Sequence, residues 1–182
     1  MLNHPQAQLV TGCDTHLVAQ LVALQQDAFP SQMQFRNPEA YYREALADQR
    51  NINLVLKNEH QDVTGYLHAL PLPVVVAELH PWDPGLKADP TILYVDIIQT
   101  LPGRRHYAGF LALIDETCRE ARDRGYRHIA MHVRISNGLS RLIQKLYPRK
   151  CEPRHLENWF GSGEPFDYLE VVPQRYRTRP GS

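Results

Sequence analysis

The residues best suited to chemistry follow a short apolar run that ends near Ile98. Arg104 and Arg105 lie between that run and a predicted helix over residues 108–124, and Gly109 lies at the start of that helix. The first amides of a helix lack partners within the helix and carry the positive end of its dipole, so they bind anions. The pattern therefore indicates a phosphate-binding loop, and the alternative is an ordinary strand-to-helix loop with surface arginines.

Asp96 is the single charged residue inside the apolar run 92–98. A carboxylate surrounded by apolar residues becomes a stronger base, which is what a general base needs. Asp96 is therefore the first candidate for that role. The alternative is a structural carboxylate that is hydrogen-bonded to a neighbouring strand or helix end.

Histidine and cysteine offer no metal or disulfide pattern. The nine histidines and the cysteines Cys13, Cys118 and Cys151 show no metal-ligand spacing and no Cys-x-x-Cys pair. We therefore expect no metal and three reduced thiols. His132 alternates with apolar neighbours in the run 129–133, which favours a hydrogen-bonded core histidine over a proton relay.

Hydropathy and capping residues predict one α/β domain over residues 1–173 and a basic tail over residues 174–182. The expected strands cover residues 8–11, 52–57, 63–70, 92–98 and 129–133, and the expected helices cover residues 15–28, 38–46, 108–124 and 138–146, with a helical turn over 75–79. Asn137 is expected to cap the last helix. A right-handed crossover would make the strands 92–98 and 129–133 parallel neighbours.

The composition argues against several classes of protein. The chain has 182 residues, 43% of them hydrophobic, and its 20 Lys and Arg balance 20 Asp and Glu. Zero net charge gives no basic surface for nucleic acid. No apolar run approaches the ~20 residues of a membrane span, and the N-terminus has no secretory pattern. We expect a cytoplasmic protein that binds neither nucleic acid nor membrane.

Three short stretches carry a resemblance to a known family. Val63–Leu67 (VTGYL) resembles its third strand, Asp96–Ile98 with Leu101–Arg105 (LPGRR) its fourth strand and phosphate loop, and Asn137–Ser140 with Leu142–Leu146 its last helix. In these motifs, and in the order of elements over residues 8–172, the chain resembles the GNAT superfamily of acyl-CoA-dependent N-acetyltransferases.

The resemblance implies a fold and a function. The fold would be α/β (α+β), with a mixed, mostly antiparallel sheet in which the fourth and fifth strands are parallel and splay apart. The function would be acetyl transfer from acetyl-CoA to a primary amine of a small molecule or peptide, by direct attack and without a metal. The protein would be a monomer or homodimer, and the alternative is a GNAT-fold CoA-binding or regulatory module without turnover.

The resemblance also assigns cofactor contacts to the fourth strand, the following loop and helix start, and the last helix. These residues are Ile98, Thr100, Arg104, Arg105, His106, Tyr107, Ala108, Gly109, Phe110, Asn137 and Ser140. The Ile98 backbone amide would polarise the thioester carbonyl. The loop matches the family pattern in two registers, one beginning at Arg104 and one at Arg105, and neither has both glycines.

Two further assignments depart from the family or vary within it. Many members have a tyrosine seven residues beyond the asparagine, where this chain has Gln144, so Tyr147 is the expected proton donor, with a core aromatic as the alternative. Acceptor contacts are expected from the segment between the first two helices and from the Pro-rich stretch: Phe29, Met33, Phe35, Glu78 and Trp82. The alternatives are core packing for the first three and a solvated loop side chain for Glu78.

Overall fold

The computed structural model describes residues 6–101, 106–147 and 151–174. The strands are β1 (Ala7–Leu9), β2 (Ile52–Lys57), β3 (Val63–Pro71), β4 (Ile92–Thr100), β5 (His128–Arg134), β6 (Arg154–Leu156) and β7 (Phe166–Val171). The helices are α1 (Thr15–Ala28), α2 (Pro38–Ala47), α3 (Leu72–Leu79), α4 (His106–Asp123) and α5 (Leu139–Leu146).

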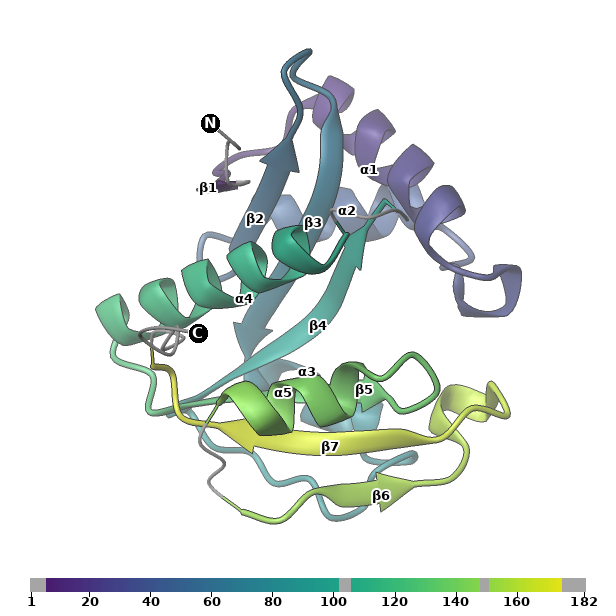
Figure 1. Ribbon diagram of the computed structural model, residues 1–182, viewed down its shortest axis with the longest axis vertical. Coiled ribbons are helices and arrows are strands. Elements are labelled where there is room, and N and C mark those ends of the chain that lie inside the picture. The colour runs from purple at the N-terminus through teal and green to yellow at the C-terminus, as the bar shows by residue number, and fades with distance from the viewer. Residues whose placement is uncertain (1–5, 102–105, 148–150, 175–182) are drawn as a thin grey trace, which may run out of the picture. The chain divides into compact units, whose positions relative to one another are not determined.

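The strands form one seven-stranded sheet in the order β1-β2-β3-β4-β5-β7-β6 (Figure 1). β4 and β5 are parallel, and β1–β2, β2–β3, β5–β7 and β6–β7 are antiparallel pairs. The parallel register runs from Ile92↔His128 to Val95↔Met131, so Asp96 is the first β4 residue beyond it. The expected mixed sheet with a parallel fourth and fifth strand is confirmed.

Within the described residues, contacts divide the chain into two compact units. Unit 1 comprises residues 1–70 and 96–117, and unit 2 comprises residues 71–95 and 118–182. The division cuts β4 between Val95 and Asp96, at the end of its pairing with β5. The expectation of one domain over residues 1–173 stays a prediction.

The helices of unit 1 begin where their capping residues predict. Asp14 Oδ1 accepts a hydrogen bond from the His16 amide at 3.0 Å, and Asn37 Oδ1 accepts one from the Ala40 amide at 3.3 Å. Each bond satisfies an amide that has no partner within its helix. Pro38 stands at the first position of α2, where its fixed φ suits a helix start.

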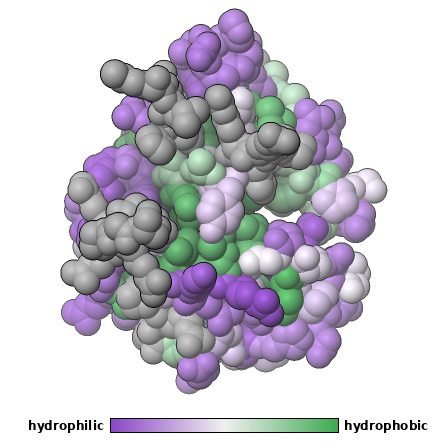
Figure 2. Space-filling view, in the orientation of Figure 1, coloured by the Kyte–Doolittle hydropathy of each residue, from purple (hydrophilic) through white to green (hydrophobic). Residues whose placement is uncertain are grey.

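The β2–β3 hairpin buries both of its faces in unit 1. Val55 and the cross-strand Tyr66 belong to a core cluster with Leu21 of α1 and Tyr42 of α2, whereas their neighbours Leu56 and Gly65 lie on the other face. At the hairpin tip, Asn58–Asp62, the Asn58 side chain accepts amide bonds from His60 and Asp62 at 2.9 Å. This tip is the hydrophilic top of the surface in Figure 2.

Two glycines allow α4 to approach this hairpin closely. A Cβ on Gly65 would lie 2.7 Å from Leu56 Cδ1, and a Cβ on Gly109 would lie 2.9 Å from the same atom. Both distances are shorter than carbon atoms tolerate, so the Leu56 methyl fills the space that the missing side chains leave. Gly109 therefore has a packing role in α4 that does not depend on any ligand.

Two elements of unit 2 differ from the sequence expectation. α3 is a full helix over Leu72–Leu79 instead of one turn, because the proline at its start sets a helical φ. The N-cap of α5 is Gly138, with φ +76°, and not Asn137. Asn137 still satisfies an amide of the first turn, because its Oδ1 accepts from Leu139 N at 3.1 Å.

No helix in the described part of the chain is both long and apolar enough to cross a membrane.

We expect Gly65→Ala and Gly109→Ala each to lower the free energy of unfolding by about 1–3 kcal/mol through overpacking. Because both conflicts involve Leu56 Cδ1, each cost should shrink markedly in a Leu56→Ala background. Urea unfolding of the single and double variants measures the coupling. If each glycine substitution costs as much free energy in the Leu56→Ala background as in the parent, Leu56 is not the shared obstacle.

Candidate functional site

In unit 1, Asp96 of β4 is hydrogen-bonded to α2 and lies close to β3. The Tyr41 hydroxyl donates to Asp96 Oδ2. His68 Nδ1 lies 2.9 Å from the Tyr41 oxygen and 3.7 Å from Asp96 Oδ2. The Asp96 side chain is 25% exposed and the His68 side chain only 4%, so the carboxylate is the member of the group that solvent reaches.

Aromatic packing fixes the position of Tyr41. Its ring centroid lies 4.0 Å from that of Phe35, 5.3 Å from that of Tyr42 and 5.7 Å from that of His68. Burial, and next the charge of Asp96, raise the pKa of Tyr41 well above its ordinary value. The phenol therefore stays protonated and donates a hydrogen bond to Asp96.

The sequence suggests two roles for Asp96, a general base and a structural carboxylate, and this arrangement is compatible with both. The carboxylate is bonded to a neighbouring element, as a structural carboxylate would be, and it also keeps contact with solvent, as a general base must. Its catalytic role stays a prediction. Sequence reasoning missed Tyr41 and His68, which are 55 and 28 positions away from Asp96 along the chain.

The predicted cofactor residues around the start of α4 differ in accessibility. Arg104 and Arg105 lie outside the described residues, as does the His106 side chain. Tyr107 is 50% exposed and Ala108 is exposed, whereas Gly109 and Phe110 are buried. Upstream in β4, Ile98 is half-buried and Thr100 is buried. The exposed described residues at the start of α4 are therefore Tyr107 and Ala108.

The predicted cofactor residues of α5 belong to a polar group in unit 2. The buried Ser140 hydroxyl donates to Asp167, and Gln144 Nε2 donates to the Ser140 oxygen at 2.9 Å. Asn137 is exposed. Tyr147 is 3% exposed and follows the last residue of α5, which suits the alternative of a core aromatic.

The acceptor residues predicted in unit 1 lie in the connection between α1 and α2. Phe29 and Phe35 are half-buried and pack against the core cluster of this unit, and Met33 is half-buried in a 3₁₀ turn. This placement agrees with the alternative of core packing for the two phenylalanines. Their contact with an acceptor stays a prediction.

In unit 2, Trp82 is part of an exposed aromatic pair. Its ring stacks on Phe160 with centroids 5.3 Å apart, and the two side chains are 39% and 45% exposed. Phe160 has φ +52°, a conformation that costs a non-glycine residue free energy. Sequence reasoning missed Phe160, and Glu78 is an exposed residue of α3.

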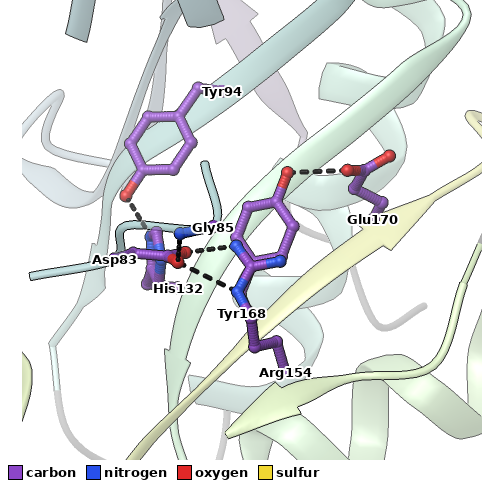
Figure 3. A network of polar contacts seen from close by, with 7 residues as sticks. All are labelled: Asp83, Gly85, Tyr94, His132, Arg154, Tyr168 and Glu170. Carbon is purple, nitrogen blue, oxygen red and sulfur yellow. Dashed lines mark hydrogen bonds and ion pairs between the residues drawn. The ribbon is translucent and has the colours of Figure 1, made fainter. Parts of the chain in front are cut away.

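An ion pair between the buried Asp83 and the partly exposed Arg154 anchors the loop after α3 in unit 2 (Figure 3). Asp83 is 1% exposed; its Oδ1 accepts from Arg154 Nε at 2.9 Å and from the Gly85 amide at 3.1 Å, and Arg154 Nη2 bonds to Oδ2. Arg154 also lies over the Tyr168 ring, whose hydroxyl donates to Glu170 at 2.8 Å. This network joins the loop to β6 and β7.

His132 extends the same network to β4. Its Nε2 lies 3.1 Å from Asp83 Oδ2, and its Nδ1 lies 2.8 Å from the Tyr94 hydroxyl. The side chain is 1% exposed, and its ring stacks on Trp159 at 3.7 Å. This is the hydrogen-bonded core histidine that the sequence favours.

Cys13, Cys118 and Cys151 are free thiols, and Cys118 is buried. Within residues 6–101, 106–147 and 151–174, no group of three His, Cys, Asp or Glu side chains is placed to hold a metal ion.

Comparisons with known proteins identify relatives by fold and not by sequence. No family model and no curated protein matches the sequence. Among solved structures, the chain is similar to an aminoglycoside 6'-acetyltransferase type Ii, with TM-score 0.69 and 13% identity over 94% of this chain and 99% of that one.

Two further structures show the same likeness. One is Arabidopsis thaliana NAA60 in complex with acetyl-CoA, with TM-score 0.66 and 13% identity over 92% of this chain and 98% of that one. The other is the ribosomal-protein-S18-alanine N-acetyltransferase of Escherichia coli, with TM-score 0.59 and 12% identity over 97% of this chain and 100% of that one. At such identities the likeness is one of fold.

The ion pair of Asp83 should make stability depend on pH. Burial by itself would raise the pKa of Asp83, but hydrogen bonds from His132 and Arg154, with their charges, outweigh it and lower the pKa to about 2. A carboxylate with a lowered pKa stabilises the fold above its ordinary pKa, and this contribution disappears as the pH falls from about 4 to about 2.

We therefore expect Asp83→Asn to lower the free energy of unfolding at pH 7 by about 2 kcal/mol, the stabilisation that the lowered pKa of this carboxylate represents. The difference from the parent should narrow as the pH falls toward 2. Urea unfolding at pH 7, 4 and 2.5 measures it, with the exposed Asp62→Asn as the matched control. A difference that stays constant with pH would contradict the ionic origin.

Proposed function

We propose that this chain, which has the fold of the GNAT acetyltransferases, transfers an acetyl group from acetyl-CoA to a primary amine. The observation that carries the proposal is the position of Asp96. It is the first β4 residue after the parallel pairing with β5 ends, and it is a partly exposed carboxylate that a hydrogen bond holds in place. We expect a small-molecule or peptide acceptor and a cytoplasmic protein.

The proposed role of Asp96 is that of general base. The amine nitrogen attacks the acetyl carbonyl carbon, the amine proton passes to the carboxylate, and the carbon–sulfur bond breaks to release the thiol of CoA after proton uptake. Within the described residues, no side chain donates to Asp96 Oδ1, so this oxygen is available for the amine proton. Because attack is direct, the buried Cys118 needs no part in the reaction.

Acetyl-CoA supplies the activated acetyl group in this proposal, and several residues of the chain suit its binding. Tyr107 and Ala108 are exposed residues in the first turn of α4, where unpaired amides favour phosphate oxygens. Arg104 and Arg105 would add positive charge, and the Ile98 amide would face the thioester oxygen. Tyr147 remains the proposed proton donor to the leaving thiolate.

A second candidate function is a CoA-binding or regulatory module without turnover. The hydrogen bonds of α5 favour it, because Ser140 donates to Asp167 and Gln144 donates to Ser140, so these side chains are engaged within the protein. Gln144 also stands where many GNAT enzymes have a tyrosine. Binding of CoA without acetylation of any amine would support this candidate.

Calorimetric titration with acetyl-CoA, CoA and 3'-dephospho-CoA tests the cofactor, and CoA release with a panel of amines then tests turnover. We expect binding that requires the pantetheine arm. Absence of binding at millimolar ligand would overturn both candidate functions.

We expect Asp96→Asn to lower kcat about a hundredfold, because general-base catalysis contributes on this scale. The affinity for acetyl-CoA should change less than about threefold, since the carboxylate acts on the amine. Steady-state kinetics and calorimetry measure the two quantities, with the exposed Asp62→Asn as control. Equal losses of both would show that Asp96 is structural.

A further inference from the structure

We propose that Tyr41 and His68 are positioning residues for Asp96. In this arrangement, His68 donates a hydrogen bond to Tyr41, Tyr41 donates to Asp96 Oδ2, and the carboxylate is thereby held with Oδ1 directed to the acceptor amine. The inference rests on the proposed function, because it assigns its residues to the base of that reaction. All three residues belong to unit 1.

The direction of the hydrogen bonds follows from the number of protons. Tyr41 has one hydroxyl proton and uses it in the hydrogen bond that it donates to Asp96 Oδ2. Its oxygen can therefore only accept from His68 Nδ1, 2.9 Å away, which places the imidazole proton on Nδ1. Both bonds point toward the carboxylate, so the group stabilises a negative charge on Asp96.

The other nitrogen of His68 supports this tautomer. Nε2 is buried, and no described residue is its hydrogen-bond partner. A proton on Nε2 would be an unsatisfied buried donor, which is rarer and less favourable than an unsatisfied lone pair. The burial of Nε2 therefore keeps the proton on the side of Tyr41.

The surroundings make this arrangement rigid. Tyr41 is fixed by its ring contacts with Phe35 and Tyr42, and His68 lies inside β3, where it is 4% exposed. A carboxylate held by one such bond loses little freedom when the acceptor binds, so less of the binding free energy is spent on orienting it.

The other titratable groups near these residues have partners or lie farther away. The Tyr66 hydroxyl donates to Asn53 at 2.6 Å, and Tyr42 accepts from Gln99 at 3.1 Å. Asp48, at the end of α2, interacts electrostatically with His68 but is bonded to Arg50. None of these side chains is hydrogen-bonded to the Asp96 carboxylate, so among the described residues Tyr41 is the side chain that holds it.

The first experiment compares Tyr41→Phe with Tyr42→Phe, the same substitution at the next position of α2. Loss of the donor makes the Asp96 carboxylate more basic, so the acid limb of the kcat/KM profile should move up by about one pH unit in Tyr41→Phe. Its kcat should fall about tenfold, while KM for acetyl-CoA is unchanged. Tyr42→Phe removes a bond to Gln99 and should leave the acid limb in place.

The second experiment tests the direction of the His68 bond. The Asn side chain can present an amide donor near the position of Nδ1, whereas Leu cannot donate. We therefore expect His68→Leu to move the acid limb in the same direction as Tyr41→Phe, and His68→Asn to restore it toward the parent. Identical profiles for the parent, Tyr41→Phe and His68→Leu, whatever their stability, would overturn the inference.

A measurement without turnover separates the two proposals. Carbon-13 NMR of the Asp96 carboxyl should show titration at higher pH in Tyr41→Phe than in the parent. Equal titration curves in an active enzyme would overturn the positioning role and leave the proposed function standing. No release of CoA with any amine would overturn the proposed function, whatever the carboxyl titration shows.

Discussion

A carboxylate removed from water must be hydrogen-bonded, and this requirement organises the polar interior of both units. In unit 2, Asp83 is almost fully buried and takes bonds from Arg154, His132 and the Gly85 amide, which join the loop after α3 to β6 and β5. In unit 1, Asp96 takes its bond from Tyr41, which ties α2 to β4. The two carboxylates differ in exposure, because solvent reaches Asp96 but hardly reaches Asp83.

Asp96 lies just beyond the part of β4 that pairs with β5. The parallel register ends at Val95, and the next residue is the carboxylate. On the other face of the hairpin, Leu56 fills the space beside Gly65 and Gly109 and accounts for a close approach of α4. Gly109, which fits one register of the predicted phosphate loop, therefore also has a role in packing.

The fold could be predicted from the sequence more readily than the phosphate-loop motif of the family could be recognised in it. Strand and helix positions follow from hydropathy and capping residues such as Asp14 and Asn37, which act within a few positions of the chain. The predicted phosphate loop has both glycines of the family pattern in neither of its two registers, and no family model matches the sequence. Solved acetyltransferases with 12–13% identity nevertheless share the fold, because burial constrains the pattern of apolar residues more than their identities.

The sequence by itself determined the order of the elements, the parallel pair of strands and Asp96 as the candidate base, because periodicity and a charge in an apolar run are local signals. Only the tertiary structure decided that Tyr41 and His68 accompany Asp96, that Asp83 is the partner of Arg154 and that Phe160 stacks on Trp82. These contacts join residues 28 to 78 positions apart. Hydrogen bonding and ring packing at that separation depend on how the strands and helices meet, which no local pattern records.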